Sequence, residues 1–336
     1  MGEMIGKQSV KFAEAPYIFE GASVVGPKEG EGPLGKLFDV IEQDPMLGSK
    51  SWEEAESLLQ KETVQKLLLK SGLKKGDIRY IFAGDLLGQL IATTFGIMDY
   101  EIPFMGLYGA CSTMGEGLSL AAMMVAAGYG ENVIAMASSH FGSAERQFRF
   151  PLEYGNQRPF SATWTVTGCG AAIVTKRKGF ARITGVTTGK IIDYGVKDAQ
   201  NMGACMAPAA ADVIYNHLND FGTAPDDYDK IITGDLGYVG QAILIDLLKR
   251  KGIDISKVHM DCGIEMFDKE NQDTHSGGSG CGCSATVLTS YVFKQLKKKA
   301  WKKILFIPTG ALMSPISFNQ GKSVPGIAHL VMIESV

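Results

Sequence analysis

The chain has 336 residues, of which 45% are hydrophobic and 21% are charged. At about 150 residues per domain, this length predicts two domains or one large fold built from two halves, and the composition excludes wholesale disorder. The net charge of −3 excludes nucleic-acid binding driven by bulk charge, and the longest apolar stretch, residues 118–127, is too short to span a bilayer. The N-terminus lacks the hydrophobic core of a signal peptide, so we expect synthesis in a cytoplasm.

The first strong helix signal covers residues 51–70. Ser51 and Glu54 have the spacing of a capping box, apolar residues follow with a helical period, and Gly72 provides a stop. A short apolar run that ends in Gly84-Asp85 then predicts a buried strand.

This stretch is repeated once, 150 positions later. Residues 72–86 and 222–236 align without a gap, and six of their fifteen positions are identical, which is far above chance. The second copy again has a helix, expected at about 209–220, and an apolar strand that ends in Gly234-Asp235.

A turn with glycine and cysteine also occurs in both halves. The motif Gly-Ala-Cys-Ser at 109–112 opens a helix of small residues to about position 128, and a strand follows at 132–137. Residues 280–285 open a second such helix to about position 299, and a strand follows at 304–307.

Each half therefore alternates strand and helix, with nearly continuous apolar strands. This pattern predicts an α/β fold with two mixed, mostly parallel sheets that are covered on both faces. We expect an N-terminal half at residues 1–178 and a C-terminal half at residues 179–336, with the two small-residue helices packed between the sheets.

The cysteines carry no metal or disulfide signature. No pair has the C-x-x-C spacing, and the chain is large and without a secretion signal. We therefore expect free thiols, no metal and no cofactor. The six positions are Cys111, Cys169, Cys205, Cys262, Cys281 and Cys283.

Several of these motifs together resemble known proteins. The duplicated αβαβα unit, the turn at 109–112 and the segment 166–174 resemble the thiolase and ketoacyl-synthase superfamily, which implies its five-layer fold. An ordered set of further motifs is similar to the stage V sporulation protein AD family of spore-forming bacteria: Gly26-Pro-Lys-Glu, Gly32-Pro-Leu-Gly, Ala83-Gly-Asp-Leu-Leu, Ser138-Ser-His140, Ala144-Glu-Arg-Gln-Phe-Arg149, Glu153-Tyr-Gly, Met206-Ala-Pro-Ala-Ala-Ala-Asp212 and Gly277-Gly-Ser-Gly-Cys281.

This resemblance implies a ligand and a location. Members of the family bind pyridine-2,6-dicarboxylic acid (dipicolinic acid) and take part in moving it into the developing spore. We therefore expect dipicolinic acid or its calcium chelate as the ligand, and peripheral association with the spore inner membrane through other membrane proteins of the same sporulation system. Superfamily members are usually dimers through the edge of the central sheet, so a homodimer is expected.

Cys111 is the first candidate for chemistry. A thiol at a helix N-terminus lies at the positive end of the helix dipole, which predicts a lowered pKa. A small buried side chain without a reactive role is the alternative. Acyl-transfer enzymes of the superfamily pair this cysteine with His or Asn from the second half. Here Asp235 stands near one of those places, and its carboxylate would repel an oxyanion.

Two histidines remain as partners for Cys111. His275 lies just before the loop 277–284, which contains no His or Asn, and we interpret it as a solvated loop residue. If His275 or His140 acted as a base, the chain would be a Cys-dependent acyltransferase or condensing enzyme. We expect instead that the scaffold is retained and the reaction lost. The remaining histidines have no catalytic role: His217 and His259 are expected at the surface, and His329 in a structural role.

A helix N-terminus beside several glycines suits a small anion. Arg146 and Arg149 are basic candidates for it. Each could instead form a salt bridge, to Glu145 or Glu153. The expected ligand-binding residues are Asp85, Cys111, Ser112, His140, Arg146, Asp235, Gly278, Ser279 and Gly280.

Other interpretations stay open. Asp85 and Asp235, at matching strand ends, could cap a helix, bind a cation carried with the ligand, or shape the pocket wall, and capping is the default. The chain could also be a purely structural subunit with a vestigial pocket. The cationic run at 297–303 predicts a solvated surface or one that faces anionic lipid or a partner.

Overall fold

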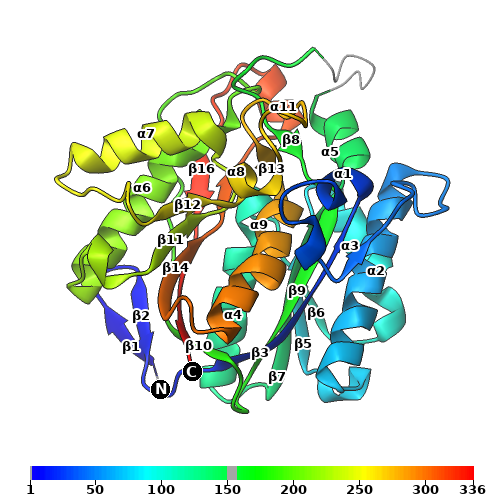
Figure 1. Ribbon diagram of the computed structural model, residues 1–336, viewed down its shortest axis with the longest axis vertical. Helices are drawn as coiled ribbons and strands as arrows, with labels where there is room; N and C mark the ends of the chain where they lie inside the picture. The colour runs from blue at the N-terminus through cyan, green and yellow to red at the C-terminus, as the bar shows by residue number, and fades with distance from the viewer. Residues whose placement is uncertain (1, 150–156) are drawn as a thin grey trace.

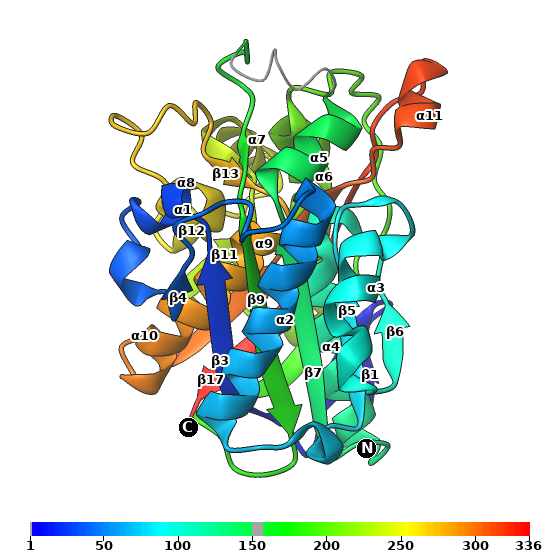
Figure 2. The ribbon, with the colours of Figure 1, turned by 90° about the vertical axis from the view of Figure 1, so that its right-hand side faces the viewer.

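The computed structural model describes residues 2–149 and 157–336. Two half-sheets alternate with three layers of helices, which confirms the predicted α/β fold (Figures 1 and 2). One outer layer holds α2 (Trp52–Ser71) and α3 (Ile91–Ile97), the middle layer α4 (Thr113–Ala126), α9 (Cys281–Val287) and α10 (Phe293–Lys297), and the other outer layer α6 (Met202–Phe221) and α7 (Gly237–Lys249).

The two half-sheets repeat one strand order. From the outer edge, the first two pairings are parallel and the next two are antiparallel in both. The first half has β6 (Phe104–Gly106), β5 (Tyr80–Gly84), β7 (Asn132–Ser139), β9 (Gly168–Thr175) and β3 (Tyr17–Val25). The second has β12 (His259–Asp261), β11 (Lys230–Thr233), β14 (Lys303–Ile307), β17 (Leu330–Ser335) and β10 (Ala181–Thr187). The duplication seen in the sequence is therefore a duplication of topology.

A short antiparallel contact joins the half-sheets. Ala181 pairs with Ile18, and Arg182 pairs with Tyr17, so β3 and β10 make the two predicted sheets continuous. The predicted boundary at residue 178 falls in the turn between β9 and β10 and stays a prediction.

The ends of one outer helix, α2, could be predicted from local sequence signals, whereas the start of α6 could not. The hydroxyl of Ser51 accepts the N–H of Glu54 at 3.3 Å, and Gly72 ends α2 with a φ of 69°. The predicted start of α6 at residue 209 was wrong. The helix begins at Met202, after the side chain of Asn201 caps it, and runs on through Pro208.

The middle helices need small residues because both faces are covered. Every residue of α9 is buried, and a Cβ atom on Gly170 of β9 would lie 2.3 Å from the carbonyl oxygen of Ala285. The helix predicted from 280 to 299 is interrupted by a π-helical turn at Leu288–Val292 and ends at Lys297.

Shorter elements connect these layers or, like β1 (Gly2–Ile5) and β2 (Ser9–Phe12), pair with the main sheet near the chain termini (Figure 1). Among the described residues, no helix combines the length and the apolar character that crossing a membrane requires. The other short elements are α1 (Pro27–Gly30), β4 (Val40–Ile41), α5 (Phe141–Phe148), β8 (Trp164–Thr165), α8 (Cys262–Met266), β13 (Gly278–Ser279), β15 (Thr309–Ala311), α11 (Pro315–Asn319) and β16 (Gly326–Ala328).

Candidate functional site

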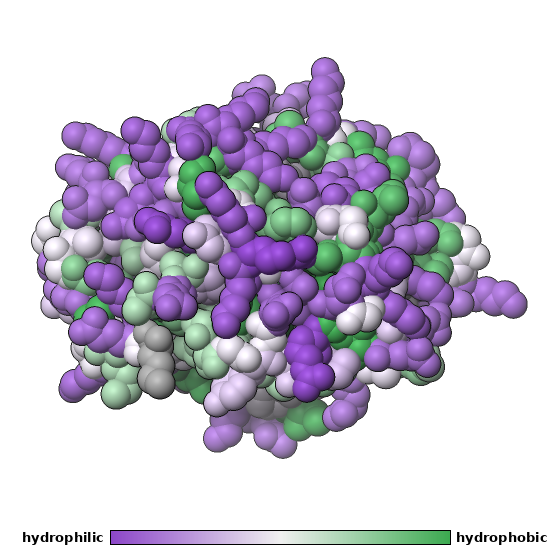
Figure 3. All heavy atoms as spheres, turned by 90° about the horizontal axis from the view of Figure 1, so that it is seen from below, coloured by the Kyte–Doolittle hydropathy of each residue, from purple (hydrophilic) through white to green (hydrophobic). Residues whose placement is uncertain are grey.

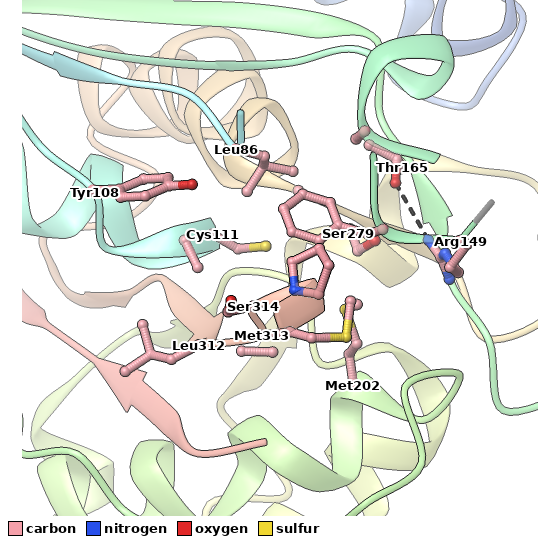
Figure 4. A pocket seen from close by; sticks show the side chains of 16 residues that line it. Leu86, Tyr108, Cys111, Arg149, Thr165, Met202, Ser279, Leu312, Met313 and Ser314 are labelled. Atoms are coloured by element: carbon pink, nitrogen blue, oxygen red, sulfur yellow. Dashed lines mark hydrogen bonds between the residues drawn. The ribbon is translucent and has the colours of Figure 1, made fainter. Parts of the chain in front are cut away.

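A cavity of about 280 Å³ lies where the two halves meet (Figure 4). Its walls come from the segments that follow β5 and β15 and from those that precede α4, α6 and α9, together with α5 and β8. The lining residues are Leu86, Tyr108, Ala110, Cys111, Ala144, Phe148, Arg149, Thr165, Met202, Ser279, Gly280, Ala311, Leu312, Met313, Ser314 and Pro315. Three residues of the predicted site, Cys111, Ser279 and Gly280, are among them.

Cys111 reaches the cavity from a tight turn. A single 3-10 turn, Ala110–Ser112, precedes α4, and Ala110 has a φ of 51°, which is rare for a residue with a side chain. The thiol extends toward the centre of the cavity (Figure 4) and is otherwise almost fully buried. The predicted position of Cys111 at the start of a buried helix therefore agrees with the structure.

Asp235 lies behind this thiol. Its Oδ2 atom accepts the N–H of Gly280 at 3.0 Å, its Oδ1 atom accepts the hydroxyl of Thr309 at 2.7 Å, and the thiol of Cys111 is a further partner. Burial raises the pKa of Asp235 to about 7 despite these hydrogen bonds. Asp235 is therefore part of the cavity frame although it does not line the cavity.

The predicted lowering of the Cys111 pKa was wrong. Burial raises the pKa of this thiol well above its ordinary value, and the neighbouring charge of Asp235 raises it further. The helix N-terminus favours the thiolate. Burial of the thiol and the negative charge of Asp235 both disfavour it, and together they outweigh the helix. The thiol is therefore protonated near neutral pH.

Neither candidate histidine is next to Cys111. His140 has its Nε2 atom 2.7 Å from the carbonyl oxygen of Pro45, and it caps the N-terminus of α5. His275 has its Nδ1 atom 3.0 Å from the carbonyl oxygen of Pro159 and does not line the cavity. Within residues 2–149 and 157–336, no imidazole lies where a base for Cys111 would have to be.

Asp85 has the capping role that was the default interpretation. Its Oδ2 atom accepts both the N–H and the hydroxyl of Thr93 in α3, at 2.8 and 2.6 Å, and its Oδ1 atom accepts the N–H of Leu87. The side chain is completely buried and is not part of the cavity wall.

The two arginines of the same segment have different places. Arg146 is about half exposed and forms a salt bridge with Glu53, away from the cavity. Arg149 lines the cavity, forms a buried salt bridge with Glu145, and lies 3.4 Å from the hydroxyl of Thr165 (Figure 4). Its Nε atom has no acceptor among the described residues. Glu153, the alternative salt-bridge partner in the sequence, lies outside the described residues.

Ser112 and Gly278 lie directly behind the wall. The hydroxyl of Ser112 donates to the carbonyl oxygen of Gly109 at 2.7 Å, and Gly278 pairs with Trp164 in the short sheet of β8 and β13. Sequence motifs missed most of the apolar lining, such as Leu86, Phe148, Met202 and Met313, because these residues come from four unrelated segments.

The expectation of a surface position was also wrong for His217, and His259 is half-buried. His217 is fully buried between the hydroxyls of Thr187 and Tyr228, and burial lowers its pKa to about 3. His259 lies 2.9 Å from the hydroxyl of Thr233, and burial lowers its pKa to about 4.

We predict that Cys111 reacts slowly with iodoacetamide near neutral pH. The raised pKa leaves little thiolate, which is the reactive species. Asp235→Asn keeps an acceptor for the N–H of Gly280 and removes the charge, so the Cys111 pKa should fall and the alkylation rate at pH 8 should rise about tenfold for each unit of pKa. Peptide mass spectrometry reports the rate at this one position.

Asp193→Asn provides the matched control, because Asp193 is exposed and far along the chain from this turn. It should leave the Cys111 rate unchanged. Rapid alkylation of wild-type Cys111 at pH 7, as fast as in the Asp235→Asn variant, would show that the thiol is already activated.

Solved structures with the same architecture show the fold. A 3-oxoacyl-[acyl-carrier-protein] synthase III from Aquifex aeolicus VF5 has a TM-score of 0.57 at 12% identity, covering 95% of this chain and 99% of that chain. A thiolase from Ascaris suum in complex with coenzyme A has a TM-score of 0.59 at 11% identity, covering 96% and 100%. The predicted thiolase-like fold is confirmed.

The sequence comparisons show the family. Residues 6–334 match the family described as stage V sporulation protein AD. The chain is 42% identical over 332 residues to the stage V sporulation protein AD of Bacillus subtilis (strain 168), covering 99% of this chain and 98% of that protein. The predicted resemblance is therefore confirmed, and the chain belongs to the stage V sporulation protein AD family.

Proposed function

We propose that this chain binds dipicolinic acid, alone or as its calcium chelate, in the cavity beside Cys111 without converting it. In this role it takes part in uptake of the acid into the developing spore, at the spore inner membrane and together with membrane proteins of the same system. Membership of the family supports this proposal. The observation that carries it is Arg149, a mostly buried cation that lines an otherwise mostly apolar cavity.

The cavity has the chemistry that a flat aromatic dicarboxylate needs. Apolar side chains such as Leu86, Phe148 and Met313 offer contact area for a ring. Arg149 offers a charge-assisted hydrogen bond to one carboxylate, and such bonds are strong where water is excluded. The second carboxylate can lie toward the exposed side of Ser314 and remain hydrated.

The same geometry argues against acyl transfer. A condensing enzyme needs a thiolate and donors that stabilise an oxyanion. At this site Asp235 occupies the space next to the thiol with an acceptor that keeps the proton on Cys111. The cavity is therefore better suited to hold an anion at Arg149 than to develop negative charge beside Cys111.

We predict that dipicolinate raises the melting temperature. A ligand that binds only the folded state adds about 2.7 kcal/mol at about 100 times its Kd, which corresponds to a rise of several degrees. Arg149→Gln should weaken binding about tenfold to a hundredfold because a charge-assisted hydrogen bond is lost. Arg146→Gln is the matched control and should bind as the wild type does. Calorimetric titration with and without Ca²⁺ measures each Kd.

A second variant tests the site independently, in case Arg149→Gln fails to fold. Ser314 is exposed at the rim, so Ser314→Trp should block the cavity without disturbing the core. Wild-type protein that binds no dipicolinate in either condition would contradict the proposal and favour a structural subunit with a vestigial pocket. Equal losses in Arg146→Gln and Arg149→Gln would contradict the placement of the ligand.

We further propose that the chain forms a homodimer along β6. All residues of this edge strand are exposed, and an unpaired strand edge offers N–H and C=O groups to a second copy. Large apolar side chains are exposed on β6 itself and on the segment 91–98, which is unusual for a free surface. These are Ile91, Phe95, Met98, Phe104 and Met105.

We predict a dimeric mass for the wild type by light scattering and a monomeric mass for the double variant Phe95→Glu/Met105→Glu. In a twofold interface each introduced glutamate lies near the same glutamate of the second copy, and the two buried negative charges repel each other. Leu69→Glu, at a side chain that is 76% exposed on α2, is the control and should stay dimeric. A wild-type protein that is monomeric at micromolar concentration would contradict this assembly.

A further inference from the structure

Two strongly basic segments lie at the end of the molecule opposite the cavity. Residues 176–182 turn from β9 into β10, and residues 294–303 lead from α10 into β14. They contain four and six basic residues and no acidic residue. Because the whole chain carries −3, the positive charge is concentrated here and the remainder of the chain is acidic. We refer to these two segments as the basic end.

The two segments form one surface. The N–H of Val336 donates to the carbonyl oxygen of Phe180 at 3.0 Å, and the N–H of Ser335 donates to that of Lys302 at 2.9 Å. The ammonium group of Lys297 lies 4.7 Å from the centre of the Phe180 ring. Strand β17 therefore holds the two turns side by side, near both chain termini (Figure 1).

Most of this charge is not neutralised within the chain. Lys297 is paired with Glu20 at 2.8 Å, and Arg182 is paired with Glu334 at 3.0 Å. Asp229, the third nearby carboxylate, accepts the backbone N–H groups of the segment and not a lysine side chain. Among the described residues of the basic end, six exposed lysines have no salt bridge: Lys176, Lys178, Lys294, Lys298, Lys299 and Lys302.

We propose that the basic end binds the surface of an anionic lipid bilayer. Several unpaired lysines at one end of the molecule match a surface of negative headgroups, where each adds to the attraction. Trp301 lies within the lysine run, is half-buried, and packs edge-on against Tyr291 at 5.4 Å. A partly exposed indole with one apolar side suits the boundary between headgroups and acyl chains. Viewed from this end, hydrophilic side chains project between apolar ones (Figure 3).

This arrangement favours lipid over nucleic acid. A nucleic-acid site needs cations along a groove and ring faces that are free to stack on bases. Here the cations lie on the tips of two turns, and Trp301 is already packed. Attachment by this end would leave the cavity, at the opposite end, open to the aqueous side and accessible to a ligand while the protein is bound.

The test is sedimentation of the full chain with vesicles of phosphatidylcholine alone and of an equal mixture of phosphatidylcholine and phosphatidylglycerol. Wild-type protein should sediment only with the anionic vesicles, and added salt should release it, because exposed charges are screened. The triple variant Lys176→Glu/Lys178→Glu/Lys298→Glu should bind at least tenfold more weakly, since each basic residue near the surface contributes about fivefold.

The triple variant Lys50→Glu/Lys197→Glu/Lys322→Glu is the matched control, because these lysines are also exposed, lie outside the basic end, and give the same change in net charge. It should bind vesicles as the wild type does, and both variants should melt as the wild type does and bind dipicolinate with unchanged Kd. An unchanged Kd for dipicolinate in both variants shows that lipid binding and ligand binding can be lost independently. Equal losses in both variants, no binding of the wild type to anionic vesicles, or tighter retention by duplex DNA than by vesicles at the same salt would overturn it.

Discussion

The buried carboxylate of Asp235 is the interaction on which the rest of the site depends. A carboxylate without water is costly unless donors surround it. Asp235 gathers the N–H of Gly280 and the hydroxyl of Thr309 from the second half, and the thiol of Cys111 from the first. These contacts fix the loops that form the cavity wall, and they also keep the proton on the thiol. One residue therefore explains both why the thiolase-like cavity persists and why its cysteine is not a prepared nucleophile.

The fold could be predicted because the same pattern of strands and helices occurs twice in the sequence. The repeat around Gly84-Asp85 and Gly234-Asp235 marks equivalent strand ends, and local signals such as Ser51 and Gly72 bound α2. The start of α6 could not be placed, because Pro208 suggests a boundary that the packed helix overrides.

The site was less predictable, because burial decides its chemistry. Position at a helix start is visible in the sequence, whereas the desolvation that raises the Cys111 pKa depends on residues from the other half. The choice between Arg146 and Arg149 has the same origin. The two side chains are three positions apart, and only the end of α5 at Phe148 turns Arg149 into the cavity while Arg146 remains with Glu53.

The molecule separates its chemistry in space. Arg149 and Cys111 lie at a mostly apolar cavity at one end, and uncompensated lysines lie at the other. The apolar edge at β6 lies on a third surface. Each surface suits a different proposed partner: an anionic aromatic acid, a lipid headgroup layer and a second copy of the chain.

The central claim is that the cavity binds without covalent chemistry at Cys111. The most direct measurement is the intact mass of the wild-type protein after incubation with acetyl-coenzyme A and with a longer acyl-coenzyme A. Our account predicts an unchanged mass in both cases, because Asp235 keeps the thiol protonated. A mass increase of one acyl group, mapped to Cys111 and absent in Cys111→Ala, would contradict it.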